Sequence, residues 1–203
     1  LGIDVKKLDK YLENNTLQKK NFCINKKTKK KIRLCIALHT YGYPCDIKNL
    51  KKILDKRNII LIEDSAEAIG SFVNKKHLGT FGFAGIYSFN GNKIITSGGG
   101  GAIVSSNKKF IQKCEKLITT AKAKHKYLFF HDELGYNYRM PNLNAALGYA
   151  QIIKLKNILN SKRTLNKKYK ENFKDSKYLK IFSGKNNLQY NNWLNVAILK
   201  NKY

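Results

Sequence analysis

Apolar positions along the chain alternate between helical spacing and short continuous runs. Val5, Leu8 and Leu12 recur at the spacing of one helix face. Asp4 precedes them, where its carboxylate can cap the first turn of that helix. Residues 59–62 are all apolar, as is typical of a parallel strand buried on both faces. The pattern therefore predicts an α/β chain with a parallel sheet.

The same analysis predicts the remaining elements from capping residues, turn residues and apolar runs. Residues 17–31 are polar and rich in lysine, which predicts a loop or a short hairpin. We then expect a strand at 32–38, a helix capped by Asp46, strands at 84–89 and 102–104, and a helix from the cap Asn107 to about residue 121. A further helix should have Pro141 in its first turn, with an apolar stripe of Leu143, Ala146, Leu147 and Ala150. A helix over 161–173 and two strands after residue 178 complete the prediction.

The chain is strongly basic, with a formal net charge of +27 that would ordinarily indicate a nucleic-acid partner. Among the 40 basic residues, however, only four are arginine, the residue that most often reads bases. The lysines are also spread along the whole chain rather than gathered in one segment. A nucleic-acid-binding protein is therefore kept as an alternative and not as the leading hypothesis.

Cysteine usage and apolar run lengths indicate a cytoplasmic protein. The four cysteines form no Cys-x-x-Cys pair and no zinc-finger spacing with histidine, so we expect buried free thiols and no metal site. There is no apolar run long enough to cross a bilayer and no basic-then-apolar leader, so we expect no membrane partner. The chain does not begin with Met, so an N-terminal part can be missing.

Two residues are placed where parallel α/β sheets bind ligands. Asp64 lies two residues after the buried run at 59–62, at the carboxyl end of the predicted strand. Taken alone, an aspartate in this position is more often a turn residue or a helix cap than a ligand contact. Lys93 lies between a strand and the four glycines at 98–101, which permit positive φ and close approach of a ligand. A lysine amine in such a place can form a Schiff base with an aldehyde, whereas an exposed or phosphate-contacting lysine is the alternative.

Five motifs then occur in one order over nearly the whole chain. They are H-T-Y-G at 39–42, E-D-S-A-E-A-I-G-S at 63–71, H-L-G-T-F-G with G-I-Y-S-F at 77–89, N-K with four glycines at 92–101, and G-Y-N-Y-R-M with A-A-L-G at 135–148. This set resembles the DegT/StrS-type sugar aminotransferases. One departure is Phe83-Ala84, which stands where the family has Asp-Ile.

The resemblance implies a type I aminotransferase fold that depends on pyridoxal 5'-phosphate, with an α/β/α large domain around a mostly parallel sheet, incomplete at both ends. Residues 1–158 would form the central part of the large cofactor-binding domain. Residues 159–203 would form a connecting helix and the start of the small C-terminal domain. The phosphate-cradling helix start and the ring-stacking aromatic of the family's N-terminal part are absent, so an inactive fragment or remnant is an alternative.

Site residues follow from the resemblance by motif. Lys93 matches the lysine that carries the cofactor and acts as acid and base in the proton shift. Asp64 matches the aspartate that pairs with the pyridine nitrogen. Ser88 matches a hydroxyl residue that contacts the cofactor phosphate. Glu67 matches a Gln or Glu near the ring, and Asn137 an asparagine that reaches a phosphate across a dimer interface. For His39 and Arg139, structural hydrogen bonding and ligand contact both remain open.

The resemblance also implies a reaction and partners. Residues 23–28, 89–93 and 98–101 look like the subgroup that aminates UDP- or GDP-linked 4-keto-6-deoxy-N-acetylhexosamines for cell-surface glycans. We therefore expect transfer of an amino group from glutamate to such a sugar nucleotide, by a cytoplasmic homodimer. Related sugar dehydratases replace the lysine by histidine, so Lys93 argues against that reaction.

Overall fold

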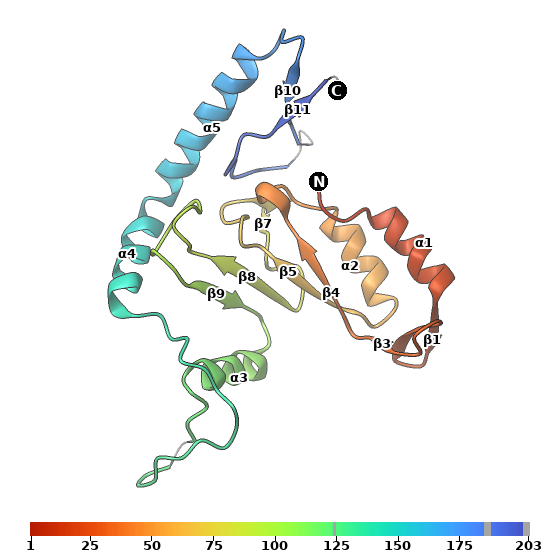
Figure 1. Cartoon of the computed structure of the whole chain (residues 1–203), viewed down its shortest axis with the longest axis vertical. Helices are drawn as coiled ribbons and strands as arrows, with labels where there is room; N and C mark the ends of the chain where they lie inside the picture. The colour runs from red at the N-terminus through yellow and green to blue at the C-terminus, as the bar shows by residue number, and fades with distance from the viewer. Residues whose placement is uncertain (124, 185–187, 201–203) are drawn as a thin grey trace.

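A four-stranded sheet forms the centre of the computed structural model, which describes residues 1–123, 125–184 and 188–200 (Figure 1). Its strands lie in the order β4 (Leu34–Leu38), β5 (Ile60–Asp64), β8 (Ala84–Ser88) and β9 (Gly101–Val104). β5 pairs in parallel with β4 and β8, whereas β9 runs antiparallel to β8. The predicted α/β fold with a mostly parallel sheet is therefore confirmed.

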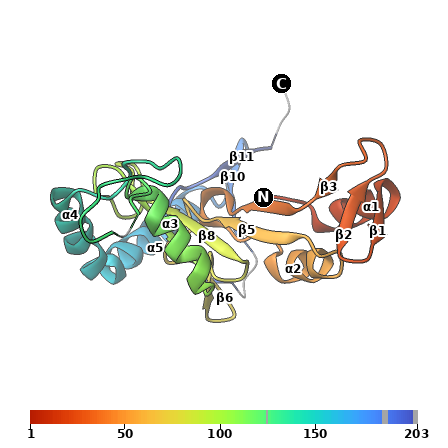
Figure 2. The same ribbon diagram turned by 90° about the horizontal axis from the view of Figure 1, so that it is seen from below.

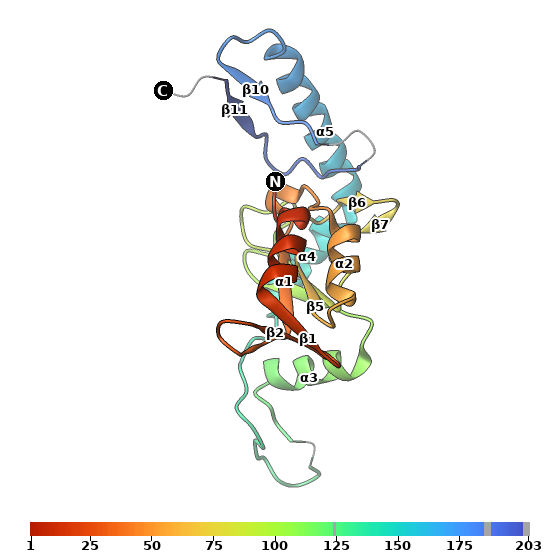
Figure 3. The same cartoon turned by 90° about the vertical axis from the view of Figure 1, so that its right-hand side faces the viewer.

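Two helices, α1 (Val5–Asn15) and α2 (Ile47–Asp55), lie on one side of this sheet (Figure 3). Alternation along β5 points Leu61 and Glu63 towards that side, where both are buried. The main apolar core fills the space between the helices and the sheet. Its largest fully buried members are Ile47, Leu50, Leu54 and Leu78.

The opposite face of the sheet is apolar as well, but it is open to solvent. The side chains that point to this face alternate with the buried ones along each strand. Six of them are each more than two-fifths exposed: Leu34, Ile36, Leu38, Ile60, Ile86 and Ile103. The apolar run at 59–62 correctly predicts a parallel strand, but the described residues bury only one of its two faces, so the expected burial on both faces is not found.

The segment before β4 forms the hairpin that was one of two expectations for residues 17–31. β1 (Thr16–Lys19), β2 (Phe22–Asn25) and β3 (Lys31–Ile32) make a separate antiparallel sheet. The single strand expected at 32–38 is thus divided at Arg33, with its two parts in different sheets. A 3-10 turn, η1 (Thr40–Gly42), follows β4, and the short hairpin of β6 (Phe72–Val73) and β7 (Lys76–His77) follows β5.

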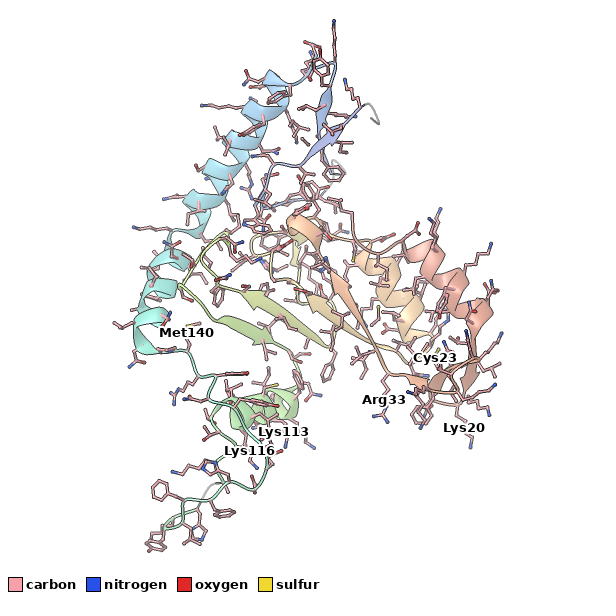
Figure 4. All side chains as sticks on the ribbon, viewed as in Figure 1. Lys20, Cys23, Arg33, Lys113, Lys116 and Met140 are labelled. Atoms are coloured by element: carbon pink, nitrogen blue, oxygen red, sulfur yellow. The ribbon has the colours of Figure 1, made fainter. Side chains whose placement is uncertain are left out.

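The second half of the chain extends away from the sheet in two directions (Figures 1 and 3). Seen from below, its helices lie towards the opposite end of the molecule from α1 (Figure 2). After β9, α3 (Lys108–Ile118) leads into a long connection over 119–141. Lys113 and Lys116, labelled in Figure 4, pair there with Asp132 and Glu133. Beyond it come α4 (Asn142–Ile153), α5 (Leu155–Asn172) and the antiparallel pair β10 (Leu179–Ile181) and β11 (Ala197–Leu199). Over the described ranges, none of the helices combines the length and the apolar character needed to span a bilayer.

The three predicted capping residues are all at helix N-caps, but only two of them make a side-chain cap hydrogen bond. Asp4 accepts a hydrogen bond from Lys7 N at 3.0 Å, and Asn107 accepts one from Phe110 N at 3.0 Å. Asp46 is at the N-cap of α2 but caps no backbone N–H, because its carboxylate accepts from the Asn49 side chain at 2.8 Å instead. The predicted start of α2 at Asp46 is thus correct, but the expected cap hydrogen bond is absent.

Four other details of the predicted helices differ from the structure. α3 ends at Ile118 rather than near residue 121, because Thr120 and Ala121 have φ values of 64° and 51° that no helix allows. The predicted helix over 161–173 is the later part of α5. Pro141 is the N-cap of α4 rather than part of its first turn, and the predicted apolar stripe is not buried, with Leu143 86% exposed.

A buried carboxylate joins the carboxyl end of the sheet to the loop that precedes β8. Glu63 is fully buried and accepts backbone hydrogen bonds from Gly79 at 2.8 Å, Phe81 at 2.6 Å and Gly82 at 2.7 Å. His39 Nε2 lies 3.0 Å from the same carboxylate. Burial alone would raise the pKa of Glu63, but the hydrogen bonds from His39, Gly82 and Gly79 hold this pKa below its ordinary value of 4.5.

We predict that Glu63→Gln lowers the free energy of unfolding at pH 7 by about 3 kcal/mol, because the amide loses the charge and turns a donor towards backbone N–H groups. Urea unfolding measures this, with the exposed Glu13→Gln as the matched control. Since the folded-state pKa of Glu63 is depressed, its contribution is complete above about pH 4.5 and is lost as the pH falls below it. A loss at pH 7 no larger than that of the control contradicts this role.

Candidate active site

Strand register brings the candidate site residues to one edge of the sheet. Leu38 of β4 and Ile86 of β8 both pair with Asp64, so the three parallel strands end side by side. Ser88 lies two residues beyond Ile86 and therefore has the same orientation. Alternation turns Asp64 and Ser88 towards the open face, at the carboxyl edge where parallel α/β sheets bind ligands.

Asp64 is partly buried and uses one of its two carboxylate oxygens locally. Oδ1 accepts a hydrogen bond from Ala66 N at 3.1 Å, which is the turn role that the sequence left open. Within the described residues Oδ2 makes no hydrogen bond. One carboxylate oxygen thus remains for a ligand, so the turn role and ligand binding are compatible.

Lys93 lies in the turn after β8, where its N–H donates to Asn90 O at 3.0 Å. Its side chain is only 14% exposed, unlike that of a solvated surface lysine. The Nζ atom lies 3.6 Å from Glu67 Oε1 and 4.3 Å from the centroid of the Trp193 ring. The amine is thus enclosed between a carboxylate and an aromatic face.

Glu67 links this lysine to a strained backbone segment. Its Oε2 accepts a hydrogen bond from Tyr41 N at 2.7 Å. Tyr41 has φ 56° and ψ 24°, a left-handed conformation that is uncommon for a bulky aromatic residue. A strained backbone conformation of this kind persists only where the surrounding contacts stabilise it, and it is common at functional sites.

The hydroxyl of Ser88 and the glycine turn lie on the two sides of Lys93 in the sequence. Ser88 Oγ accepts a hydrogen bond from Asn90 N at 3.3 Å. Gly98 and Gly100 have φ values of 79° and 89°, as the four-glycine pattern predicted. The Asn144 side chain donates to Ser97 O at 2.5 Å, which ties α4 to this turn.

Asn137 is not brought to this site within the chain. It lies exposed on the connection between α3 and α4, where it forms an isolated bridge with Thr119. No contact among the described residues joins it to Asp64, Ser88 or Lys93. Its position is therefore that of an outward-facing residue.

His39 and Arg139 have different surroundings. His39 is fully buried and its Nε2 contacts Glu63, so its observed role is structural hydrogen bonding. Its Nδ1 has no hydrogen-bond partner among the residues that the structure describes. Arg139 is exposed on the connection before α4, and among the described residues it makes no hydrogen bond or ion pair.

The cysteines take no part in this site. All four are free thiols, but the burial that was expected of all of them is found only for Cys23 and Cys45, since Cys35 and Cys114 are partly exposed. Burial is the main reason that the pKa of Cys45 is raised to about 12, with nearby acidic groups adding to the effect, so this thiol stays neutral. The described residues also include no group of three or more potential metal ligands.

Two residues at the site were missed from the sequence. Trp193 faces the Lys93 amine, and the Asn191 side chain donates to Glu67 O at 2.6 Å. Both come from the segment between β10 and β11, far along the chain from the motifs at 63–101. The one available signal was that Trp193 is the chain's single tryptophan.

Comparison with known proteins is consistent with this arrangement. The family model of the DegT/DnrJ/EryC1/StrS aminotransferases matches residues 3–203. The chain belongs to this family. The resemblance stated from the motifs is therefore confirmed over nearly the whole sequence.

Relatives within the family carry sugar-nucleotide names. The chain is 38% identical to GDP-perosamine synthase of Vibrio cholerae over 192 residues, which is 95% of this chain and 52% of that protein. It is 35% identical over 139 residues to UDP-4-amino-4,6-dideoxy-N-acetyl-beta-L-altrosamine transaminase of Campylobacter jejuni, covering 68% of this chain and 37% of that protein. The chain thus spans about half the length of the relatives it matches, or less.

Solved structures show the same fold. PseC of Helicobacter pylori, an aminotransferase of pseudoaminic acid biosynthesis, superposes with a TM-score of 0.85 at 23% identity, covering 98% of this chain and 49% of that one. GDP-4-keto-6-deoxy-D-mannose-3-dehydratase of E. coli, solved with bound hydrated PLP, superposes with a TM-score of 0.82 at 22% identity, covering 99% and 51%. The chain therefore has the fold of PLP-dependent enzymes of this family, in about half of its full extent.

We predict that Glu67→Ala lowers the free energy of unfolding by about 2 kcal/mol, because Tyr41 N–H would be left unpaired in a strained conformation. Glu67→Gln keeps an acceptor oxygen and should cost less than half as much. Urea unfolding of both variants measures the difference. Equal losses for the two substitutions would show that the Tyr41 hydrogen bond is not what Glu67 contributes.

Proposed function

We propose that this protein binds pyridoxal 5'-phosphate at Lys93 and transfers an amino group from glutamate to the 4-keto group of a nucleotide-linked 6-deoxyhexosamine. The main support is the enclosed Lys93 amine beside Glu67, at the sheet edge that also carries Asp64 and Ser88. Among the chain's many lysines, this one is held at 14% exposure within the family's N-K motif. Family membership supplies the reaction class.

The chemistry of these side chains suits the cofactor. A carboxylate with one unengaged oxygen, as on Asp64, matches a protonated ring nitrogen, and the Lys93 amine matches an aldehyde. The half-buried Ser88 hydroxyl at the neighbouring strand end can donate to a phosphate oxygen. When bound, the cofactor supplies an electron sink for the substrate's reacting carbon.

Each residue then has a defined task. Asp64 holds a proton at the ring nitrogen, since a carboxylate in a partly desolvated site stabilises that charge. The Lys93 amine moves a proton between positions on the substrate as general acid and base. Glu67, at 3.6 Å from that amine and fixed by Tyr41 N–H, orients it.

The substrate class rests on the relatives and on charge. Both named relatives produce or act on deoxyamino sugars linked to a nucleoside diphosphate, one with GDP and the other with UDP. A net charge of +27 favours such anionic substrates. The narrower choice of a 4-keto-6-deoxy-N-acetylhexosamine rests on the resemblance at residues 89–93 and 98–101.

We also propose that the protein acts as a cytoplasmic homodimer whose sites are completed by Asn137 of a second copy. Asn137 points outward on a segment rich in exposed apolar side chains, as an interface would require. The exposed large apolar residues of this segment and of α4 are Tyr127, Leu128, Phe129, Phe130, Leu134, Tyr136, Tyr138, Leu143, Leu147, Tyr149, Ile152 and Ile153. Residues 1–158 are proposed as the central part of the large domain and 159–203 as the start of the small one.

We predict that borohydride reduction in the presence of pyridoxal 5'-phosphate attaches the cofactor to Lys93. Peptide mapping by mass spectrometry measures the site, and Lys162, which lies near Trp193 but outside the motif, is the internal control. A label on any other lysine in preference to Lys93 refutes the assignment.

We predict that Asp64→Asn leaves the fold intact and lowers transaminase activity by roughly a hundredfold, or on the order of 3 kcal/mol, because an amide cannot keep the ring nitrogen protonated. Steady-state rates with matched circular dichroism spectra measure this effect. Turnover within about twofold of the parent protein counts against the role of Asp64.

We predict complementation between Lys93→Ala and Asn137→Ala chains. Each variant alone should be inactive if phosphate anchoring is needed for turnover. In a mixed dimer both lesions fall in one shared site, so activity should return to about half of the parent value per mixed dimer. Verified subunit exchange without recovery would place Asn137 in its own subunit's site.

A further inference from the structure

The segment 191–193 is distant in sequence from Lys93 but contacts its immediate surroundings. It lies between β10 and β11, and Trp193 is 101 positions along the chain from its hydrogen-bond partner Asn92. Nothing in the family motifs includes this segment. Its contacts are therefore an independent observation about how the lysine is held.

Trp193 contacts both the amine of Lys93 and the backbone next to it. The Nζ atom lies 4.3 Å from the ring centroid, within the range in which an ammonium is attracted to an indole face. The indole N–H donates to Asn92 O at 2.7 Å, so the ring is fixed to the residue that directly precedes the lysine. Trp193 is 7% exposed, which leaves its ring little freedom to move.

Apolar packing holds the ring in this orientation. Trp193 forms one buried cluster with Ile94 and Ile95, the residues that follow Lys93, and with Leu159 of α5. The cluster joins the turn that carries Lys93 to helix α5. The position of the Trp193 ring thus depends on both the turn after β8 and α5.

Asn191 fixes the other side of the site. Its Nδ2 donates to Glu67 O at 2.6 Å and to Ile69 O at 3.0 Å, and its Oδ1 accepts from Trp193 N at 3.0 Å. A side chain on Gly42, which has φ 78°, would come within 2.2 Å of that Oδ1 atom. Glycine at 42 is therefore required for this close approach.

We propose that Trp193 is a positioning residue for Lys93, with Asn191 aligning the tryptophan and Glu67 relative to each other. The amine is then held between the ring on one side and the Glu67 carboxylate on the other. The catalytic significance of this arrangement rests on the proposed function of Lys93, whereas the contact itself does not. A C-terminal segment thereby determines where the reactive amine lies.

Competitive labelling of all lysines with a limiting amount of acetic anhydride, followed by mass spectrometry, tests the proposal without cofactor. Trp193→Leu should raise the labelling of Lys93 on the order of fivefold relative to other lysines, because the ring no longer holds and covers the amine. Trp193→Phe retains an aromatic face and should stay within about twofold of the parent. Leu159→Ala is the matched control, since it loosens the same cluster without touching the amine.

Unchanged labelling in Trp193→Leu would overturn the proposal, as would an equal rise in Leu159→Ala, which would indicate general loosening. A converse measurement covers the case in which Trp193→Leu does not fold. Because the chain has one tryptophan, its emission reports on residue 193 alone. Lys93→Met should change this emission more than Lys162→Met does. In the parent protein, Lys162 Nζ contacts the backbone carbonyl of Trp193 at 3.5 Å rather than its ring. Equal changes in the two variants would overturn the proposal.

These outcomes are separate from those of the proposed function. If acetylation shows the expected pattern but pyridoxal 5'-phosphate does not label Lys93, the positioning contact stands and the cofactor assignment fails. If the cofactor labels Lys93 equally in the parent and in Trp193→Leu, and acetylation is also unchanged, the cofactor assignment stands and Trp193 has no positioning role.

Discussion

The parallel pairing of β5 between β4 and β8 is the constraint on which the rest of the structure depends. It brings three strand ends to one edge and turns successive residues to opposite faces. Glu63 therefore enters the core, where it joins His39 to the loop at 79–82. Asp64, the next residue, faces the opposite side with a free carboxylate oxygen. One strand end thus supplies both the structural anchor and the proposed cofactor contact.

Much of this arrangement could be predicted from the sequence because it is local. The apolar run at 59–62 indicates a strand of a parallel sheet, and the two carboxylates that follow it must lie at the carboxyl edge of that sheet. The glycines at 98–101 likewise predict the positive φ values of Gly98 and Gly100. The division at Arg33 could not be predicted, because an apolar run does not show which partner strand each part will choose.

The contacts of Trp193 and Asn191 could not be predicted for a related reason. They join segments that are about 100 positions or more apart, and no local pattern encodes such a pairing. The missing cap hydrogen bond at Asp46 has a local cause, because the side-chain amide of Asn49 donates to the same carboxylate. Asn137 is exposed on the connection before α4, but its proposed role concerns a second copy, which one chain cannot display.

The proposed site lies beside the open, apolar face of the sheet. Asp64 and Ser88 project from the same face as the exposed Ile36 and Ile86, so the proposed cofactor contacts lie at the edge of an uncovered apolar surface. The relatives are about twice as long as the matched region. The described residues thus supply the lysine, the carboxylates and the hydroxyl on one side of the proposed site.

The central claim is that pyridoxal 5'-phosphate binds at Lys93, and Trp193 emission tests it most directly. A cofactor attached to Lys93 would lie beside the chain's one tryptophan, so energy transfer should quench most of its emission. Titration of the parent protein should give saturable quenching. Lys162→Ala should retain this quenching and Lys93→Ala should lose it. Equal fractional quenching in Lys93→Ala and the parent protein would contradict the account.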